Sequence, residues 1–335
     1  DGVSSVVLST VEQSARPTLN AMRRPWVDAN DRYERYIRAF ERRLARTWKK
    51  PFDLLGVQLL LARDLGAELN DGLRRSIKRK DREVVEAVTR LHARACQIAA
   101  EILVLLRAGY AEGALMRWRS LHEVSVVLQF IRARGIETAK RYMEHDVVES
   151  WKAAQEYSTH SARLGYEPIT QAELAQIKQA FDAAIQKHGT SFRSSYGWAA
   201  VDLNPVKPSF AEIEKATGYG HFRPFYRMAS HPTHANPKGI LFQIGMMDGA
   251  TTLPVGPTNY GLADAAQNTG LSLSQATAAL ITFAPTFDRL LLMKVMAELA
   301  RDIGTVSVAV QQRIEAREIK SREAHGKSVG FAQRK

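Results

Sequence analysis

The sequence predicts an all-α protein, a multi-helix bundle with a long antiparallel helical hairpin at its core. Apolar residues recur three or four positions apart along most of the 335 residues, which is the period of an amphipathic helix. The period-two alternation of strands is scarce. The hydrophobic fraction of 45% and the charged fraction of 24% are ordinary for a globular protein with a core. We therefore expect one large helical domain with helical additions.

The apolar period and the loop-forming residues divide the chain into successive elements. We expect helices at about 28–48, 52–72, 80–109, 111–134, 137–164, 170–188, 208–217, 221–232, 272–300 and 302–323. The Gly, Ser and Pro content predicts loops at about 189–207 and 235–259, with one short strand at LFQIG. The tail after Gly326 is expected to be disordered. The predicted domains are a basic helical N-terminal extension (1–75), a helical core domain (76–303) and a C-terminal helix with a short basic tail (304–335).

The helices expected at 80–109 and 111–134 form the clearest unit of the chain. The run DREVVEAVTRLHARACQIAAEILVLLRAG ends at Gly109, and Tyr110 leads directly into AEGALMRWRSLHEVSVVLQFIRARG. Glycine after the last apolar residue is typical of a helix C-terminus. A link this short forces two long helices into an antiparallel hairpin.

The net charge of +12 attracts polyanions, and much of it lies in two clusters. The first runs from Arg23 to Lys50 and alternates with Glu34 and Glu41, so it fits a salt-bridged helix face as well as a phosphate-binding stripe. The second is denser and indicates either a helix junction or a nucleic-acid contact. Its proposed RNA-binding residues are Arg74, Arg75, Lys78 and Arg79.

The single cysteine, Cys96, excludes a disulfide within the chain and argues against a thiolate zinc site. A reducing cytoplasm fits this composition. No signal peptide is expected at the N-terminus, and the longest apolar stretch is interrupted by charged residues and proline, so no transmembrane helix is predicted. We expect no cofactor.

Charged and apolar residues lie side by side on the helix expected at 111–134. Arg119 and Glu123 are one turn apart, and His122 lies between them in sequence. Burying these groups beside Val and Leu is costly unless they pair with each other or with a ligand. A local Arg119–Glu123 ion pair with His122 at the helix surface is the competing interpretation.

A second polar constellation lies in GHFRPFYRMASHPTHANPKG, residues 220–239. Tyr226, Ser230 and either His231 or His234 share one side of a helix that reaches Pro232. The spacing of the two histidines suits a pair of metal ligands, but proline interrupts the helix and no carboxylate or thiolate stands nearby. A histidine-metal hydrolase would need further ligands to converge, drawn from His221, His145, Asp146 and Glu149.

The sequence lacks the short motifs of several large enzyme classes. It has no P-loop, no dinucleotide-binding glycine signature, no HExxH and no GxSxG. Acid–base chemistry by histidine, assisted by arginine, remains. This chemistry suits metal-independent cleavage of RNA, in which an imidazole removes the 2′-hydroxyl proton and a guanidinium stabilises the phosphorane.

Three segments carry a family resemblance: RAGYAEGALMRWRSLHEVSVVLQFI, SSYGWA and YRMASHPTHANPKG. They resemble a bacterial helical family of unknown function (DUF5677 type) often placed near defence systems, which is similar to the HEPN superfamily of helical ribonucleases and nucleotide-binding proteins. The resemblance covers roughly residues 80–300. Positions that match the family pattern are Arg119, Glu123, Tyr196, Trp198, Tyr226, Ser230 and His234.

HEPN ribonucleases carry an arginine followed by a histidine with a few residues between. Two matches exist here, Arg117 to His122 and Arg227 to His234, although the polar residue that usually follows the arginine is absent from both. The resemblance implies an HEPN-like fold and a homodimer in which both chains contribute to the active site. It also implies a possible antitoxin or defence-system partner protein.

Two functions remain open. The first is a toxin or phage-defence ribonuclease in which His122 or His234 is the base and Arg117, Arg119 or Arg227 stabilises phosphate, with Glu123 and His231 as further candidates. The second is a non-catalytic module that binds a nucleotide, a nucleic acid or a partner protein through an interior polar clamp. A catalytic histidine must open into a cleft, whereas a clamp would be closed by aromatic residues; these would be Trp118, Trp198 and Phe225.

Overall fold

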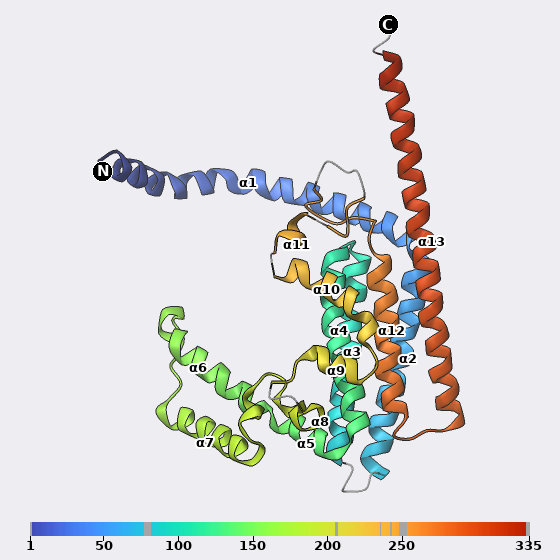
Figure 1. Cartoon of the computed structure of the whole chain (residues 1–335). Coiled ribbons are helices and arrows are strands. Elements are labelled where there is room, and N and C mark those ends of the chain that lie inside the picture. Colours follow the sequence, from blue (N-terminus) through green and yellow to red (C-terminus); the bar gives the residue numbers. More distant parts are fainter. Residues whose placement is uncertain are drawn as a thin grey trace. The chain divides into compact units, whose positions relative to one another are not determined.

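The computed structural model describes residues 2–76, 82–204, 207–234, 236–241, 243–247 and 253–332, and Figure 1 shows its elements. Every regular element in these ranges is helical and none is a strand, so the all-α prediction is confirmed. None of their helices is long and apolar enough to span a bilayer. Contacts divide the chain into two compact units, residues 1–49 and 50–335. The domain boundaries predicted at residues 75 and 303 stay predictions.

The first unit consists of one long helix, α1 (Gly2–Thr47). It begins far before the expected residue 28 because the two prolines, Pro17 and Pro25, are both accommodated within it. Its basic side chains are exposed, and Arg38 pairs with Glu34 at 3.3 Å. Several other arginines have no ion pair within the described part of the chain: Arg32, Arg35, Arg42, Arg43 and Arg46.

The centre of the second unit is the predicted antiparallel hairpin of α3 (Arg82–Arg107) and α4 (Ala111–Arg134). Gly109 turns the chain with φ 83°, a conformation that glycine adopts without steric cost. The Tyr110 amide donates to the Leu105 carbonyl at 2.9 Å and satisfies a carbonyl at the end of α3. The hairpin prediction is confirmed.

Three further helices extend this core: α2 (Lys49–Ser76), α12 (Ala263–Ile281) and α13 (Phe287–Ala332). Helix α12 packs against both helices of the hairpin, α2 lies against α3, and α13 packs against α12. The buried Gln58 of α2 donates to the carbonyls of Gly270 and Met296 at 3.0 and 3.1 Å, which links all three helices. The helices predicted at 272–300 and 302–323 are divided differently, because the break falls before Phe287, near Pro285. Of the tail after Gly326, which was expected to be disordered, the residues up to Ala332 continue α13, and residues 333–335 lie outside the described residues.

A second group of elements follows α4. The helix predicted at 137–164 is two helices that meet at His145, and the predicted loop at 189–207 contains short helical turns around the buried Trp198. Trp198 packs edge-on against Phe130 and Tyr142, with ring centroids 5.8 and 5.1 Å apart, and so anchors this segment to α4 and α5. The bounds are α5 (Ile136–Glu144), α6 (Asp146–Leu164), α7 (Gln171–His188), η2 (Thr190–Arg193), η3 (Gly197–Ala199) and α8 (Ala200–Leu203).

Short helices then cover one side of α4: α9 (Phe210–Ala216), η4 (Gly220–Phe222), α10 (Arg223–Thr233) and α11 (Pro237–Leu241). The strand predicted at LFQIG is wrong where it can be checked, because Leu241 ends α11 and residues 243–247 form turns; Phe242 lies outside the described residues. These short helices bring α10 against α4, as the hypothesis of an interior polar clamp requires.

Candidate functional site

The two predicted polar constellations meet where α10 packs against α4. Arg119 donates through Nη2 to Tyr226 Oη at 2.9 Å, and Tyr226 Oη donates to Glu123 Oε1 at 2.5 Å. The Arg119 guanidinium also lies over the Tyr226 ring, 4.7 Å from its centroid, a favourable cation–π arrangement. Arg119 Nε lies 3.3 Å from Glu123 Oε1, so the local ion pair is confirmed, with Tyr226 as its third member.

Two tyrosines at this site are held in their neutral, protonated form. Burial raises the pKa of Tyr226, and the neighbouring Glu123 carboxylate raises it further. Burial likewise raises the pKa of Tyr196 to about 12. Both phenols therefore keep their proton at neutral pH, and Tyr226 donates its proton to Glu123.

His122 lies beneath this cluster and is fully buried, so its expected place at the helix surface is wrong. Its Nε2 is 2.8 Å from Oε1 of the buried Glu214 on α9, and Glu214 Oε2 accepts from Arg223 Nη1 at 3.1 Å. Burial lowers the pKa of His122 and outweighs the opposing effect of Glu214. We therefore assign a neutral imidazole that donates its Nε2 proton to Glu214, which receives its positive partner from Arg223.

The two arginine–histidine pairs of the resemblance are not brought together as pairs. Arg117 forms an ion pair with Glu101, while His122 is enclosed on another face of α4. Arg227 lies on α10, but His234 is exposed just beyond that helix. Arg227 instead shares a cavity with His231.

That cavity, of about 710 Å³, lies beside α10 and is called the α10 cavity. Its basic lining residues are Arg223, Arg227 and Lys238, and His231 and one carboxyl, Glu112, also face it. Apolar walls complete it: Pro224, Met228, Pro232 and Ile244. Size, apolar walls and a few converging polar groups are the features of a small-ligand site.

The tautomer of His231 is determined by Asn236. The Gly239 amide donates to Asn236 Oδ1 at 3.0 Å, so the amide nitrogen of Asn236 faces His231 Nδ1, also at 3.0 Å. Because an amide nitrogen only donates, His231 Nδ1 must accept and the neutral ring carries its proton on Nε2. This imidazole is therefore a hydrogen-bond donor whose basic nitrogen is already occupied.

Gly239 is required for this arrangement. A Cβ at this position would lie 2.6 Å from the His231 carbonyl oxygen, closer than van der Waals contact permits. Only glycine lets α11, with Lys238, approach the end of α10 so closely.

Sequence analysis missed several residues of this site. Glu112 stands in the first turn of α4, and burial raises the pKa of its carboxyl. Glu214, Arg223 and Lys238 were not assigned either. Glu214 carried one usable signal, since it is a charged residue on the apolar side of a short predicted helix next to Ile213.

The remaining predicted residues have separate places. Ser230 donates to the Tyr226 carbonyl at 2.7 Å, a bond within α10. Arg74 and Arg75 belong to α2, with their side chains outside the described part, and Lys78 and Arg79 lie wholly outside it. Of the three aromatic residues expected to close the clamp, Trp118 and Trp198 are buried but Phe225 is exposed.

The ligands of the histidine-metal alternative do not converge. His145 is buried, and its Nε2 lies 3.1 and 2.9 Å from the carbonyls of Phe192 and Ser194, while His234 is exposed. Across the described ranges no three His, Cys, Asp or Glu residues form a group that could hold a metal ion.

Comparison with known proteins agrees with the resemblance at the family level. The model of a family described as "Family of unknown function (DUF5677)" matches residues 85–250, a range that includes α4, α9 and α10. No curated protein and no solved structure matches the chain. Residues 85–250 of this chain, which match this family of unknown function, carry the α4–α10 cluster and every residue that lines the α10 cavity.

Proposed function

We propose that the protein binds single-stranded RNA by holding its phosphates in the α10 cavity. The supporting observation is the convergence of Arg223, Arg227 and Lys238 on one cavity that also contains a neutral imidazole donor. Guanidinium groups offer several N–H donors in a planar fork that matches phosphate oxygens. A phosphate-bearing ligand satisfies all of these groups together.

The charge balance of the cavity favours an anion. Arg223, Arg227 and Lys238 face one carboxyl, Glu112. Arg223 also pairs with the buried Glu214, so Arg227 and Lys238 are the cations that have no ion pair within the described residues. Burial raises the pKa of the Glu112 carboxyl and so favours its uncharged form. One carboxyl cannot offset all the positive charge of the cavity, so an excess of positive charge remains where a phosphate would bind.

Two further observations favour a polynucleotide over a small anion. The chain carries a net charge of +12, and α1 presents arginines that are not neutralised by ion pairs within the described residues. Such positive surfaces bind phosphate backbones by releasing counterions. RNA as a ligand and a single thiol also agree with a cytoplasmic location.

The states of the histidines favour binding over cleavage. A base that removes the 2′-hydroxyl proton needs an accessible lone pair. His122 is enclosed and donates to Glu214, and the basic nitrogen of His231 is occupied by Asn236. Both rings act as donors in this conformation.

Metal-independent cleavage of RNA is the second candidate, and Glu112 is the observation that favours it. A carboxyl with a raised pKa beside cationic groups is a general acid–base candidate. In that reaction the ionised Glu112 would accept the 2′-hydroxyl proton as that oxygen attacks phosphorus, and Arg223 or Arg227 would stabilise the phosphorane. The bond from phosphorus to the 5′-oxygen would then break, and the departing oxygen would take the proton back from Glu112. The HEPN resemblance would then imply a homodimer and a toxin or defence role, with a possible partner protein as inhibitor.

The binding proposal is tested by fluorescence anisotropy with a labelled single-stranded RNA over a series of salt concentrations. We expect Arg227→Ala to weaken binding about tenfold and to reduce the slope of log K against log salt by about 0.7, the value for one lost phosphate contact. Arg163→Ala is the matched control, because Arg163 is an exposed arginine on α6 away from the cavity. Equal affinities for Arg227→Ala and Arg163→Ala would refute the proposal.

The same preparations separate binding from cleavage when incubated with RNA in EDTA. Products with cyclic phosphate ends that disappear in Glu112→Gln would establish the second candidate. Intact RNA with retained binding supports the non-catalytic function. Cleavage lost in His122→Ala or His234→Ala, but not in Glu112→Gln, would place the chemistry outside the α10 cavity.

A further inference from the structure

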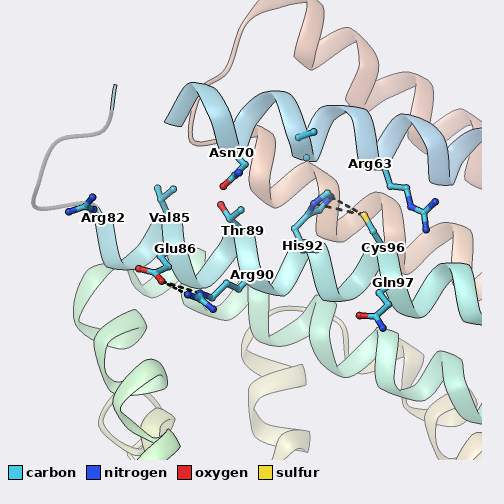
Figure 2. Close-up of a pocket in the computed structure, with 13 residues that line it drawn as sticks. Arg63, Asn70, Arg82, Val85, Glu86, Thr89, Arg90, His92, Cys96 and Gln97 are labelled. Atoms are coloured by element: carbon cyan, nitrogen blue, oxygen red, sulfur yellow. Dashed lines mark hydrogen bonds and ion pairs between the residues drawn. The ribbon is translucent and has the colours of Figure 1, made fainter. Parts of the chain in front are cut away.

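A second cavity, of about 820 Å³, lies between α2 and α3 and is called the α2–α3 cavity. Figure 2 shows its polar side chains in a row along the two helices. Arg63, Cys96 and Gln97 lie at one end of the row, and Arg82 lies at the other. The cavity shares no lining residue with the α10 cavity.

Three arginines line the α2–α3 cavity, and they differ in their partners. Arg90 is neutralised by Glu86, with Nη2 to Oε1 at 2.7 Å. The side chains of Arg63 and Arg82 make no ion pair or hydrogen bond with any residue in the described part of the chain. The cavity therefore has an excess of positive charge and free guanidinium donors, which favours an anionic ligand.

The middle of the cavity contains polar atoms that lack good partners. Thr277 Oγ1 donates to the Leu273 carbonyl at 2.9 Å, so it accepts the Nε2 proton of His92 at 3.0 Å. His92 Nδ1 then carries a lone pair, and the Cys96 sulfur 4.0 Å away offers only a weak donor. The hydroxyl oxygen of Thr89 is buried and has no hydrogen-bond partner. A buried polar atom without a partner costs about 1–3 kcal/mol, which a hydrogen-bonding ligand would recover.

Small side chains leave room for the body of a ligand. A Cβ at Gly66 would lie 2.8 Å from two atoms of the His92 ring, so glycine allows this ring to lie directly against α2. Ala67, Val85 and Ala93 supply apolar wall beside it. The volume is within the range of small-ligand sites.

We propose that the α2–α3 cavity binds a small phosphomonoester, a nucleoside or sugar phosphate, with the phosphate on Arg63 and the polar ring of the ligand facing Thr89 and His92. A phosphate matches a free guanidinium, and a hydroxyl or amino group on the ligand ring supplies the donor that His92 Nδ1 lacks. This site is independent of RNA binding in the α10 cavity.

The test is isothermal titration of the full-length protein with adenosine monophosphate, ribose 5-phosphate, adenosine and inorganic phosphate. We expect the two phosphomonoesters to bind at least tenfold more tightly than inorganic phosphate or adenosine. The tighter of the two identifies whether the ligand is a nucleotide or a sugar phosphate. No binding by either phosphomonoester, or equal binding of inorganic phosphate, would overturn the proposal.

Two variants locate the binding. Arg63→Ala removes an exposed side chain, and we expect at least a tenfold loss of phosphomonoester affinity. Thr89→Val removes the unpartnered hydroxyl at nearly constant shape, so the free protein should melt at a higher temperature while its affinity falls several-fold. If Thr89 had only a structural role, Thr89→Val would not raise the melting temperature and lower the phosphomonoester affinity together.

Arg227→Ala and Arg163→Ala serve as controls and should leave phosphomonoester affinity unchanged. If Arg227→Ala abolishes it, the phosphate binds in the α10 cavity and the inference is wrong, while the RNA proposal survives. If Arg63→Ala and Thr89→Val both retain full affinity, the inference is equally wrong.

Discussion

The two cavities of the second unit fix the hydrogen-bonding roles of their histidines by different means. His92 in the α2–α3 cavity is enclosed by long helices, and burial lowers its pKa to about 4. His231 in the α10 cavity is only partly buried, and the Asn236 side chain, ordered by Gly239, sets its tautomer. We therefore expect a substitution at His92 to lower the stability of the fold. A change around His231 should instead weaken ligand binding with little loss of stability.

The largest expected effect tests the buried contact between His122 and Glu214, which also involves Arg223. His122→Ala removes the imidazole between α4 and α9 and leaves the buried Glu214 carboxylate with Arg223 alone. We expect the free energy of unfolding to fall by about 3–4 kcal/mol, from a new cavity and an underpartnered buried carboxylate. Urea denaturation measures it.

His234→Ala is the matched control for this measurement. His234 is exposed beyond α10, so its removal should change the unfolding free energy by less than about 0.5 kcal/mol. A similar small change in His122→Ala would mean that the His122–Glu214 contact does not support the fold.

The next effect tests whether burial keeps His92 unprotonated in the folded protein. Between pH 6.5 and about 4 the unfolded chain binds a proton at His92 and the folded chain does not, so stability falls as the pH falls through this window. The contribution is about 3 kcal/mol. His92→Gln should lose that much less stability than the parent between pH 7 and pH 4, measured by urea denaturation at each pH.

His160→Gln controls for the general effect of acid. His160 is an exposed histidine on α6, so this variant should follow the parent over the whole pH range. If His92→Gln also follows the parent, burial does not determine the protonation of His92 and the contrast between the two cavities fails.

The smallest effect concerns the arrangement of Gly239 and Asn236 around His231. Gly239→Ala places a Cβ 2.6 Å from the His231 carbonyl oxygen, which forces α11 and Lys238 away from the cavity. RNA affinity should fall about fivefold, equivalent to about 1 kcal/mol, and anisotropy measures it. Gly72→Ala is the control, because a Cβ there meets no atom within 4 Å; an equal loss in both variants would contradict this role for Gly239.

The sequence predicts the elements that depend on local patterns. The α3–α4 hairpin follows from two amphipathic runs and Gly109, and the Arg119–Glu123 pair follows from their spacing on one helix. The break before α13 was misplaced because the apolar period continues on both sides of it. Local periodicity cannot determine where the chain turns from one packed helix into the next.

The candidate site depends mainly on contacts between distant residues. The competing interpretation that placed His122 at the surface stayed open because its partner, Glu214, is 92 positions away in the sequence. Glu112 and Lys238 join one cavity only because α10 and α11 fold back over the start of α4. The spacing of residues within one helix cannot predict such a contact between segments that are distant in the sequence.

Arg223 has a single guanidinium that serves two neighbours. It supplies the positive partner of the buried Glu214, and it also lines the α10 cavity. A phosphate that draws this group toward itself weakens its hold on Glu214, and the carboxylate then depends more on His122. Ligand occupancy and the protonation of an enclosed imidazole are thereby thermodynamically linked, and this linkage is reciprocal. Ligand binding in the α10 cavity would therefore change the protonation of His122, although the ligand does not contact His122.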